Sequence, residues 1–171
     1  MDNPSVKNAI SLLLSDHAKV KQLFQQFEDI KDDQSQADRK AELVEQICKE
    51  LSVHAFVEEE IFYPAVRAAI DDDDLMDEAE VEHASVKDLI SQIETMPPDE
   101  QRLDAMMKVL SEQVEHHVSE EEDDMFVKIK KTDIDLDSLG ELINERKDSI
   151  EPYFKSPPTA KTGSESKPAN L

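Results

Sequence analysis

Apolar residues recur at every third or fourth position over most of the chain, which predicts amphipathic helices. Five segments carry this pattern: residues 5–30, 44–65, 76–93, 103–125 and 136–150. Polar residues 31–38 separate the first segment from the second. An Asp run at 71–74 separates the second segment from the third and offers an Asp as a helix cap. Pro97-Pro98 forces another break. Four long helices with short connections predict an all-α, up-down-up-down four-helix bundle, with a short extra C-terminal helix packed against it.

Polar side chains interrupt the apolar stripes of all four long helices. The residues are His17, His54, Glu58, His83, His117 and Glu121. His54 and Glu58 stand four positions apart, as do His117 and Glu121, so each pair lies on one helix face, one turn apart. The chain therefore repeats a unit in which a His on one helix is followed by His-x-x-x-Glu on the next.

A bundle with this pattern buries four imidazoles and two carboxylates together. An ionised carboxylate or an unpaired imidazole is costly in a dry interior. A metal centre removes the cost, because each buried lone pair becomes a ligand. This donor set suits two transition-metal ions, and iron, zinc and manganese all accept it.

Other polar residues near the stripes are expected to lie outside such a centre. His116 is about 100° round the helix from His117, which predicts a surface position. Glu80, three residues before His83, is expected on the helix surface, with a role as an extra oxygen ligand as the alternative. Tyr63 is expected to fill core space, with a donor role beside the centre as the alternative.

Composition narrows the class of protein. The chain has 171 residues, so we expect one domain over residues 1–152 and, because Pro, Ser and Lys are frequent there, a disordered tail over 153–171. The formal net charge of −22 disfavours nucleic acid and anionic membranes as partners. One Cys excludes an intramolecular disulfide, and the chain has neither an apolar run long enough to span a bilayer nor a secretory signal. We therefore expect a cytoplasmic protein, whose oligomeric state the sequence leaves open.

Four motifs also carry a family resemblance. They are Asp16-His17, the segment from His54 to Pro64, Glu82-His83, and the segment from His117 to Phe126. On these motifs the chain resembles, over roughly residues 5–130, the hemerythrin-like proteins with the His-His-Glu cation-binding domain. The resemblance implies a left-handed four-helix bundle with a non-haem di-iron centre. It also implies that the four imidazoles are terminal ligands and that Glu58 and Glu121 bridge the two iron ions.

The chain also departs from the oxygen-carrying hemerythrins. Those proteins have a second His on the third helix, where this chain has Ala79 and Lys87. Their fourth-helix carboxylate is an Asp at i+5, whereas Glu121 stands at i+4 from His117. The differences favour the broader bacterial-type group, which is linked to iron, oxygen, peroxide or nitric oxide.

The expected function is therefore that of a di-iron protein that binds or senses a small ligand (dioxygen, peroxide or nitric oxide) or handles iron. Six ligands leave at least one coordination position for such a molecule. Two alternatives remain. One is a di-iron enzyme that degrades peroxide, and the other is a metal-free acidic interaction bundle, whose six stripe residues would be hydrogen-bonded to one another.

Overall fold

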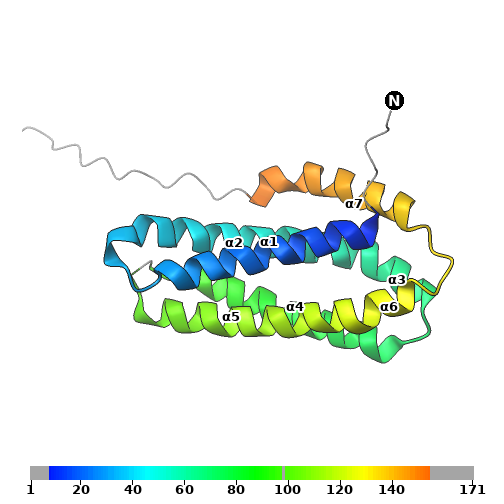
Figure 1. The fold of residues 1–171 in the computed structure, drawn as a ribbon, viewed down its shortest axis with the longest axis horizontal. Coiled ribbons are helices and arrows are strands. Elements are labelled where there is room, and N and C mark those ends of the chain that lie inside the picture. The colour runs from blue at the N-terminus through cyan, green and yellow to red at the C-terminus, as the bar shows by residue number, and fades with distance from the viewer. Residues whose placement is uncertain (1–7, 98, 155–171) are drawn as a thin grey trace, which may run out of the picture.

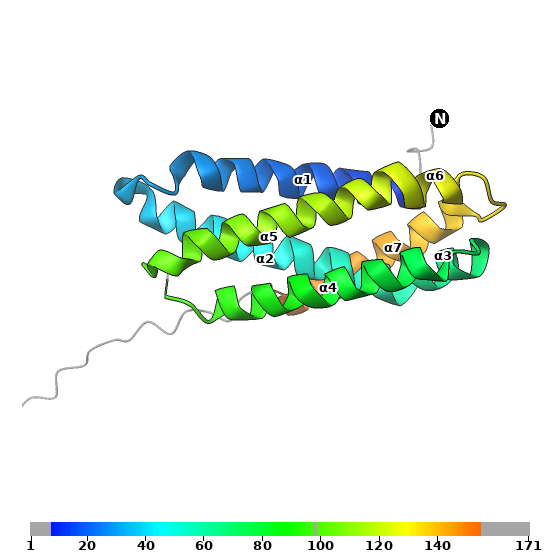
Figure 2. The same cartoon turned by 90° about the horizontal axis from the view of Figure 1, so that it is seen from below.

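A computed structural model describes residues 8–97 and 99–154, and every regular element within them is a helix. Four rods run side by side along the long axis (Figure 1, Figure 2). They are α1 (Ala9–Ile30), α2 (Ala37–Val57) with its continuations η2 (Glu58–Phe62) and α3 (Tyr63–Ala69), α4 (Asp73–Glu94), and α5 (Gln101–Glu120) with its continuations η3 (Glu121–Met125) and α6 (Phe126–Ile129). The predicted all-α four-helix bundle is confirmed.

The ends of the rods follow local capping chemistry. The side chain of Asn8 accepts a hydrogen bond from the Ser11 N–H and begins α1, and Asp72 does the same for α4 through the Leu75 N–H. The Asp run therefore supplies the expected cap. The short 3-10 helix η1 (Gln34–Gln36) turns the chain between α1 and α2, within the predicted polar break.

The core of the bundle consists of two hydrophobic clusters. One contains Leu13 of α1 and Ala79 of α4 and extends towards α3 and α6. The other contains Val20 of α1 and Val86 of α4 and extends to the opposite ends of these helices. His17 and His83 fall between the members of each pair in sequence, so a polar layer crosses the bundle between two apolar halves.

Outside the bundle, α7 (Leu136–Ile150) lies along α1 and α2 and is followed by η4 (Glu151–Phe154), as Figure 1 shows in orange. Leu139, Ile143 and Ile150 bury their side chains in the core, so α7 is the predicted extra helix. Tyr153 and Phe154 belong to η4, and the remainder of the tail expected over 153–171 lies outside the described residues. Among the described helices, none has the length and hydropathy that crossing a membrane requires.

Candidate metal centre

The polar layer brings together the six residues that the sequence singles out. His17 comes from α1, His54 from α2 and His83 from α4, while His117 lies in the last turn of α5. Glu58 and Glu121 begin η2 and η3. Each of the six residues is at most 7% exposed, and both carboxylates are at most 1% exposed.

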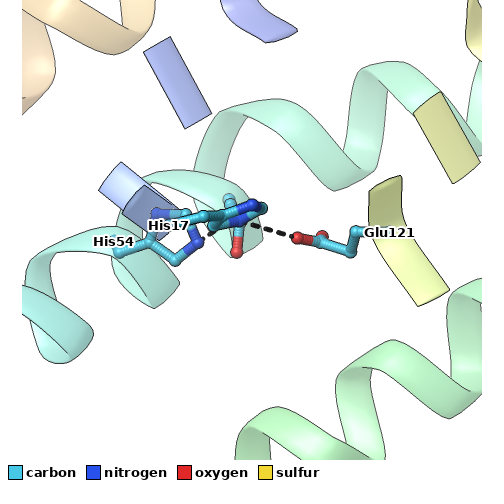
Figure 3. A group of neighbouring side chains, drawn as sticks. His17, His54 and Glu121 are labelled. Carbon is cyan, nitrogen blue, oxygen red and sulfur yellow. Dashed lines mark ion pairs between the residues drawn. The ribbon is translucent and has the colours of Figure 1, made fainter. Parts of the chain in front are cut away.

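The inward atoms of these residues form two overlapping groups. In what we call the His54 group, one donor atom from each of His17, His54, Glu58 and Glu121 lies within 4.8 Å of the others. The His83 group consists of Glu58, His83 and His117 under the same limit. Glu58 belongs to both, because its Oε1 lies 3.2 Å from His54 Nε2 and its Oε2 lies 3.3 Å from His83 Nε2. Figure 3 shows part of the His54 group converging.

Glu121 lies on the other side of the layer. Its Oε2 is 3.3 Å from His17 Nε2 and 3.7 Å from His117 Nε2, so this carboxylate also faces an imidazole of each group. The His83 and His117 Nε2 atoms face each other at 3.0 Å.

A wide helical turn begins at the Glu of each His-x-x-x-Glu pair. Both η2 and η3 are single π-helical turns, in which the Tyr63 N–H reaches the Glu58 carbonyl and the Phe126 N–H reaches the Glu121 carbonyl, five residues back. A π turn accommodates one extra residue and is common at functional sites. Here it begins at each buried carboxylate residue, so both halves of the repeat position their Glu in the same way.

The outward ring nitrogen of every buried imidazole is held by a carboxylate of the neighbouring rod. His54 Nδ1 donates to Asp16 at 3.2 Å, and His83 Nδ1 donates to Glu59 at 3.0 Å. In the same way His117 Nδ1 donates to Glu82 at 2.7 Å, and His17 Nδ1 donates to Glu122 at 2.9 Å. These four bonds close a ring around the bundle, and each orients its imidazole so that Nε2 faces inward.

Tyr63 is a residue of the layer that the sequence pattern assigned to packing. It is 2% exposed, and its hydroxyl donates to Glu121 Oε1 at 2.9 Å while lying 3.1 Å from His83 Nε2. The expected packing role is confirmed, because the ring belongs to the hydrophobic core, and the hydroxyl also has the donor role that was the alternative. Burial, followed by the charges of Glu58 and Glu121, raises the pKa of Tyr63 well above 10.0, which keeps the phenol protonated.

The equivalent position of the second repeat is apolar. Tyr63 stands five residues after Glu58, and Phe126 stands five residues after Glu121. The Phe126 ring lies parallel to the His17 ring with centroids 6.0 Å apart. The His54 and His83 groups therefore have different neighbours, one an aromatic hydrocarbon and the other a phenol. The exchange of Tyr for Phe in an otherwise repeated motif was the available sequence signal.

The other two residues considered from the sequence lie outside the layer. The Glu80 carboxylate is 54% exposed and accepts from Arg67 at 3.0 Å. The His116 ring is 64% exposed and lies 3.3 Å from both Glu82 and Glu120. Both surface predictions are confirmed.

Burial and charge act against each other within the layer. Burial lowers the pKa of His54, but the Glu58 and Asp16 carboxylates outweigh it and raise that pKa to about 10. Burial would raise the pKa of Glu58, yet the charge of His54, followed by that of His83, holds it well below 4.5. Five inward-facing buried atoms nevertheless have no hydrogen bond: His17 Nε2, His54 Nε2, both oxygens of Glu58, and Glu121 Oε2. Nitrogen and carboxylate donors left in this state fit a bound cation.

A small cavity lies beside the imidazoles. It measures about 30 Å³, and the four buried His side chains line it together with apolar residues that include Val20, Val114 and Val118. A groove of about 580 Å³ runs outside it between α1 and α5. His17 and the same three valines line both spaces, so a wall of single side chains separates the groove from the cavity.

Known proteins resemble this chain in sequence and in fold. The hemerythrin HHE cation-binding domain matches residues 8–129. The crystal structure of a hemerythrin HHE cation-binding domain-containing protein from Mycobacterium kansasii superposes with a TM-score of 0.70 at 27% identity, over 85% of this chain and 88% of that one. A DNA nickase from Nostoc sp. (strain PCC 7120) is 32% identical over 123 residues, which are 72% of this chain but 34% of the nickase. The chain thus spans about a third of the length of that relative.

Proposed function

The chain belongs to the hemerythrin HHE cation-binding domain family, and on that basis we propose that it holds a non-haem di-iron centre that binds or senses a small ligand. The six ligands would be His17, His54, Glu58, His83, His117 and Glu121. The observation that carries the proposal is the set of five buried donor atoms that face inward without a hydrogen bond, behind imidazoles whose outer nitrogens are fixed by carboxylates.

Two features support two ions rather than one. The donors divide into the His54 and His83 groups, which share Glu58. Each oxygen of Glu58 faces an imidazole of a different group, as a carboxylate between two cations would. A metal-free interaction bundle, by contrast, would be expected to satisfy these buried atoms by hydrogen bonds among themselves.

Iron fits the chemistry of the donors, since imidazole with carboxylate suits it, although zinc and manganese accept the same ligands. Iron would supply reversible redox change and an open position for a diatomic molecule or peroxide. The residues of the chain would hold the imidazoles in one orientation, exclude bulk water and place the phenolic proton of Tyr63 beside Glu121.

The cavity indicates the size and polarity of the ligand. A volume of about 30 Å³ with a largely apolar lining is suited to a molecule of a few atoms without charge, such as dioxygen or nitric oxide. We propose that the ligand enters from the groove between α1 and α5, past Val114 and Val118. We also place the protein in the cytoplasm, where a single Cys stays reduced.

Tyr63 favours a second candidate function, the breakdown of peroxide by the same centre. Cleavage of an O–O bond consumes protons, and the Tyr63 hydroxyl is a proton donor within 3.3 Å of His83, His117 and Glu121. Steady turnover of hydrogen peroxide that Glu58→Ala abolishes would favour this enzyme over simple binding. DNA nicking is not carried over from the Nostoc relative, since the chain spans 34% of it and a net charge of −22 opposes contact with phosphates.

An absorption spectrum tests the proposal. Iron-loaded protein should bind close to two iron ions per chain, and its spectrum should change when oxygen, peroxide or nitric oxide is added. The double variant His54→Ala/His117→Ala should lose both the iron and the spectrum, while His116→Ala, which removes an exposed ring, should keep them. Unchanged iron content in the double variant would refute the assignment of the site.

A further inference from the structure

The helix that follows the family domain reaches a residue that supports the candidate centre. The family match ends at residue 129, whereas α7 spans Leu136–Ile150. Figure 1 shows α7 lying along α1 and α2, on the outer side of the bundle. The helix therefore lies beyond the matched residues, and its contacts indicate what it does for the bundle.

Lys147 of α7 makes the decisive contact. Its ammonium group donates to both oxygens of Asp16, at 2.6 and 2.7 Å. Asp16 Oδ2 also accepts from His54 Nδ1 at 3.2 Å, and the opposite nitrogen of that ring lies 3.2 Å from Glu58. A continuous chain of contacts thus runs from α7 through Asp16 and His54 to the buried carboxylate that both donor groups share.

Two of the other three carboxylates of the ring have a basic side chain from within the four rods beside them. Lys87 of α4 binds Glu59 at 2.8 Å, and His116 of α5 lies 3.3 Å from Glu82. Among the described residues, Asp16 is the one ring carboxylate that an element outside the bundle holds. The Lys147 and Asp16 side chains are 24% and 16% exposed, so water competes weakly for this pair.

We propose that Lys147 is a positioning residue for the metal centre, through which α7 holds Asp16 against His54 and secures the cation of the His54 group. Without the ammonium group, the Asp16 carboxylate is drawn towards solvent and ceases to orient the imidazole. Loss of such an outer partner typically lowers metal affinity 10- to 100-fold. The inference rests on the proposed function, because it assigns His54 as a ligand.

The neighbouring residue offers a matched control. Arg146 binds Glu60 at 2.6 and 3.1 Å and lies over the Phe56 ring at 5.2 Å, so it also fixes α7 to the bundle. The Glu60 side chain is 44% exposed, and it pairs with Arg146 rather than with a buried imidazole. Arg146→Met therefore weakens the docking of α7 without touching the contacts of Asp16.

The test compares full-length wild type, Lys147→Met, Lys147→Arg and Arg146→Met, each loaded with ferrous iron without oxygen. Iron affinity is measured by competition with a chromophoric chelator, and metal-free melting temperatures report how firmly α7 is docked. We expect Lys147→Met to bind one of its two iron ions 10- to 100-fold more weakly than wild type does. Its affinity for the other ion should stay within threefold of the wild-type value. Lys147→Arg should recover most of the lost iron affinity. The affinity of Arg146→Met should stay within threefold of wild type for both ions.

Two results would overturn the inference while leaving the proposed function intact. One is wild-type affinity for both ions in Lys147→Met. The other is an equal loss in Lys147→Met and Arg146→Met, which would mean that docking of α7 alone matters. Wild-type protein that binds no iron would instead refute the proposed function itself, and this inference with it.

Discussion

Raising the pH of the metal-free protein should destabilise it through His54. The folded-state pKa of His54 is about 10, against 6.5 for the free side chain. A raised pKa gives stability that is fully present below pH 6.5 and is lost as the pH rises towards 10. At about 1.36 kcal/mol for each pH unit, the loss amounts to about 5 kcal/mol. The pKa values of His17 and His83 are also raised, because the opposing carboxylates outweigh burial, so both add to the same trend.

Thermal unfolding at pH 6, 8 and 10 measures this loss. With chelator present, we expect the melting temperature to fall by about 10–20 °C over the range, at about 2–4 °C for each kcal/mol in a chain of this size. The melting temperature of the iron-loaded protein should fall much less, because the cation takes the place of the proton on His54 Nε2. In the metal-free protein, His54→Gln should make the melting temperature depend less on pH, while His116→Gln should not. A melting temperature of the metal-free wild type that stays constant from pH 6 to 10 would refute the reasoning.

Three further predictions concern the same layer. Tyr63→Phe leaves Glu121 Oε1 without its donor and should cost the metal-free protein about 1.5–3 kcal/mol in the free energy of unfolding, measured by urea denaturation. Val118→Phe should slow nitric oxide binding by the iron-loaded protein in stopped-flow experiments without changing iron content, whereas Val109→Phe, at an exposed position of α5, should not. Acidification below about pH 4.5 should also destabilise the metal-free protein, since the pKa of Glu58 is lowered; circular dichroism would reveal this.

The sequence predicted the bundle and the meeting of the six residues because both depend on helical periodicity. A polar residue on an apolar stripe must enter the core, whatever the exact ends of its helix. His17 and His54 needed only that argument to be placed in the same layer. The break before α5 and the Asp72 cap followed from equally local chemistry.

The features of the site that the sequence did not predict depend mainly on contacts between helices. The acidic residues Asp16, Glu59, Glu82 and Glu122 look like solvated surface groups in a chain this acidic, and only the packing of adjacent rods shows that each one holds an imidazole. The π turns add one residue to a helix whose sequence still reads as regular. The outer hydrogen bonds depend on how the rods pack, and the π turns depend on local backbone geometry. Helical periodicity predicts neither of them.

The location of iron in the folded protein tests the account most directly. Crystals of the iron-loaded protein, measured at the iron absorption edge, should contain two anomalous peaks per chain. One should lie within the His54 group and the other within the His83 group, with Glu58 next to both. A single peak, or peaks at the exposed cluster of Glu82, His116 and Glu120, would contradict the account.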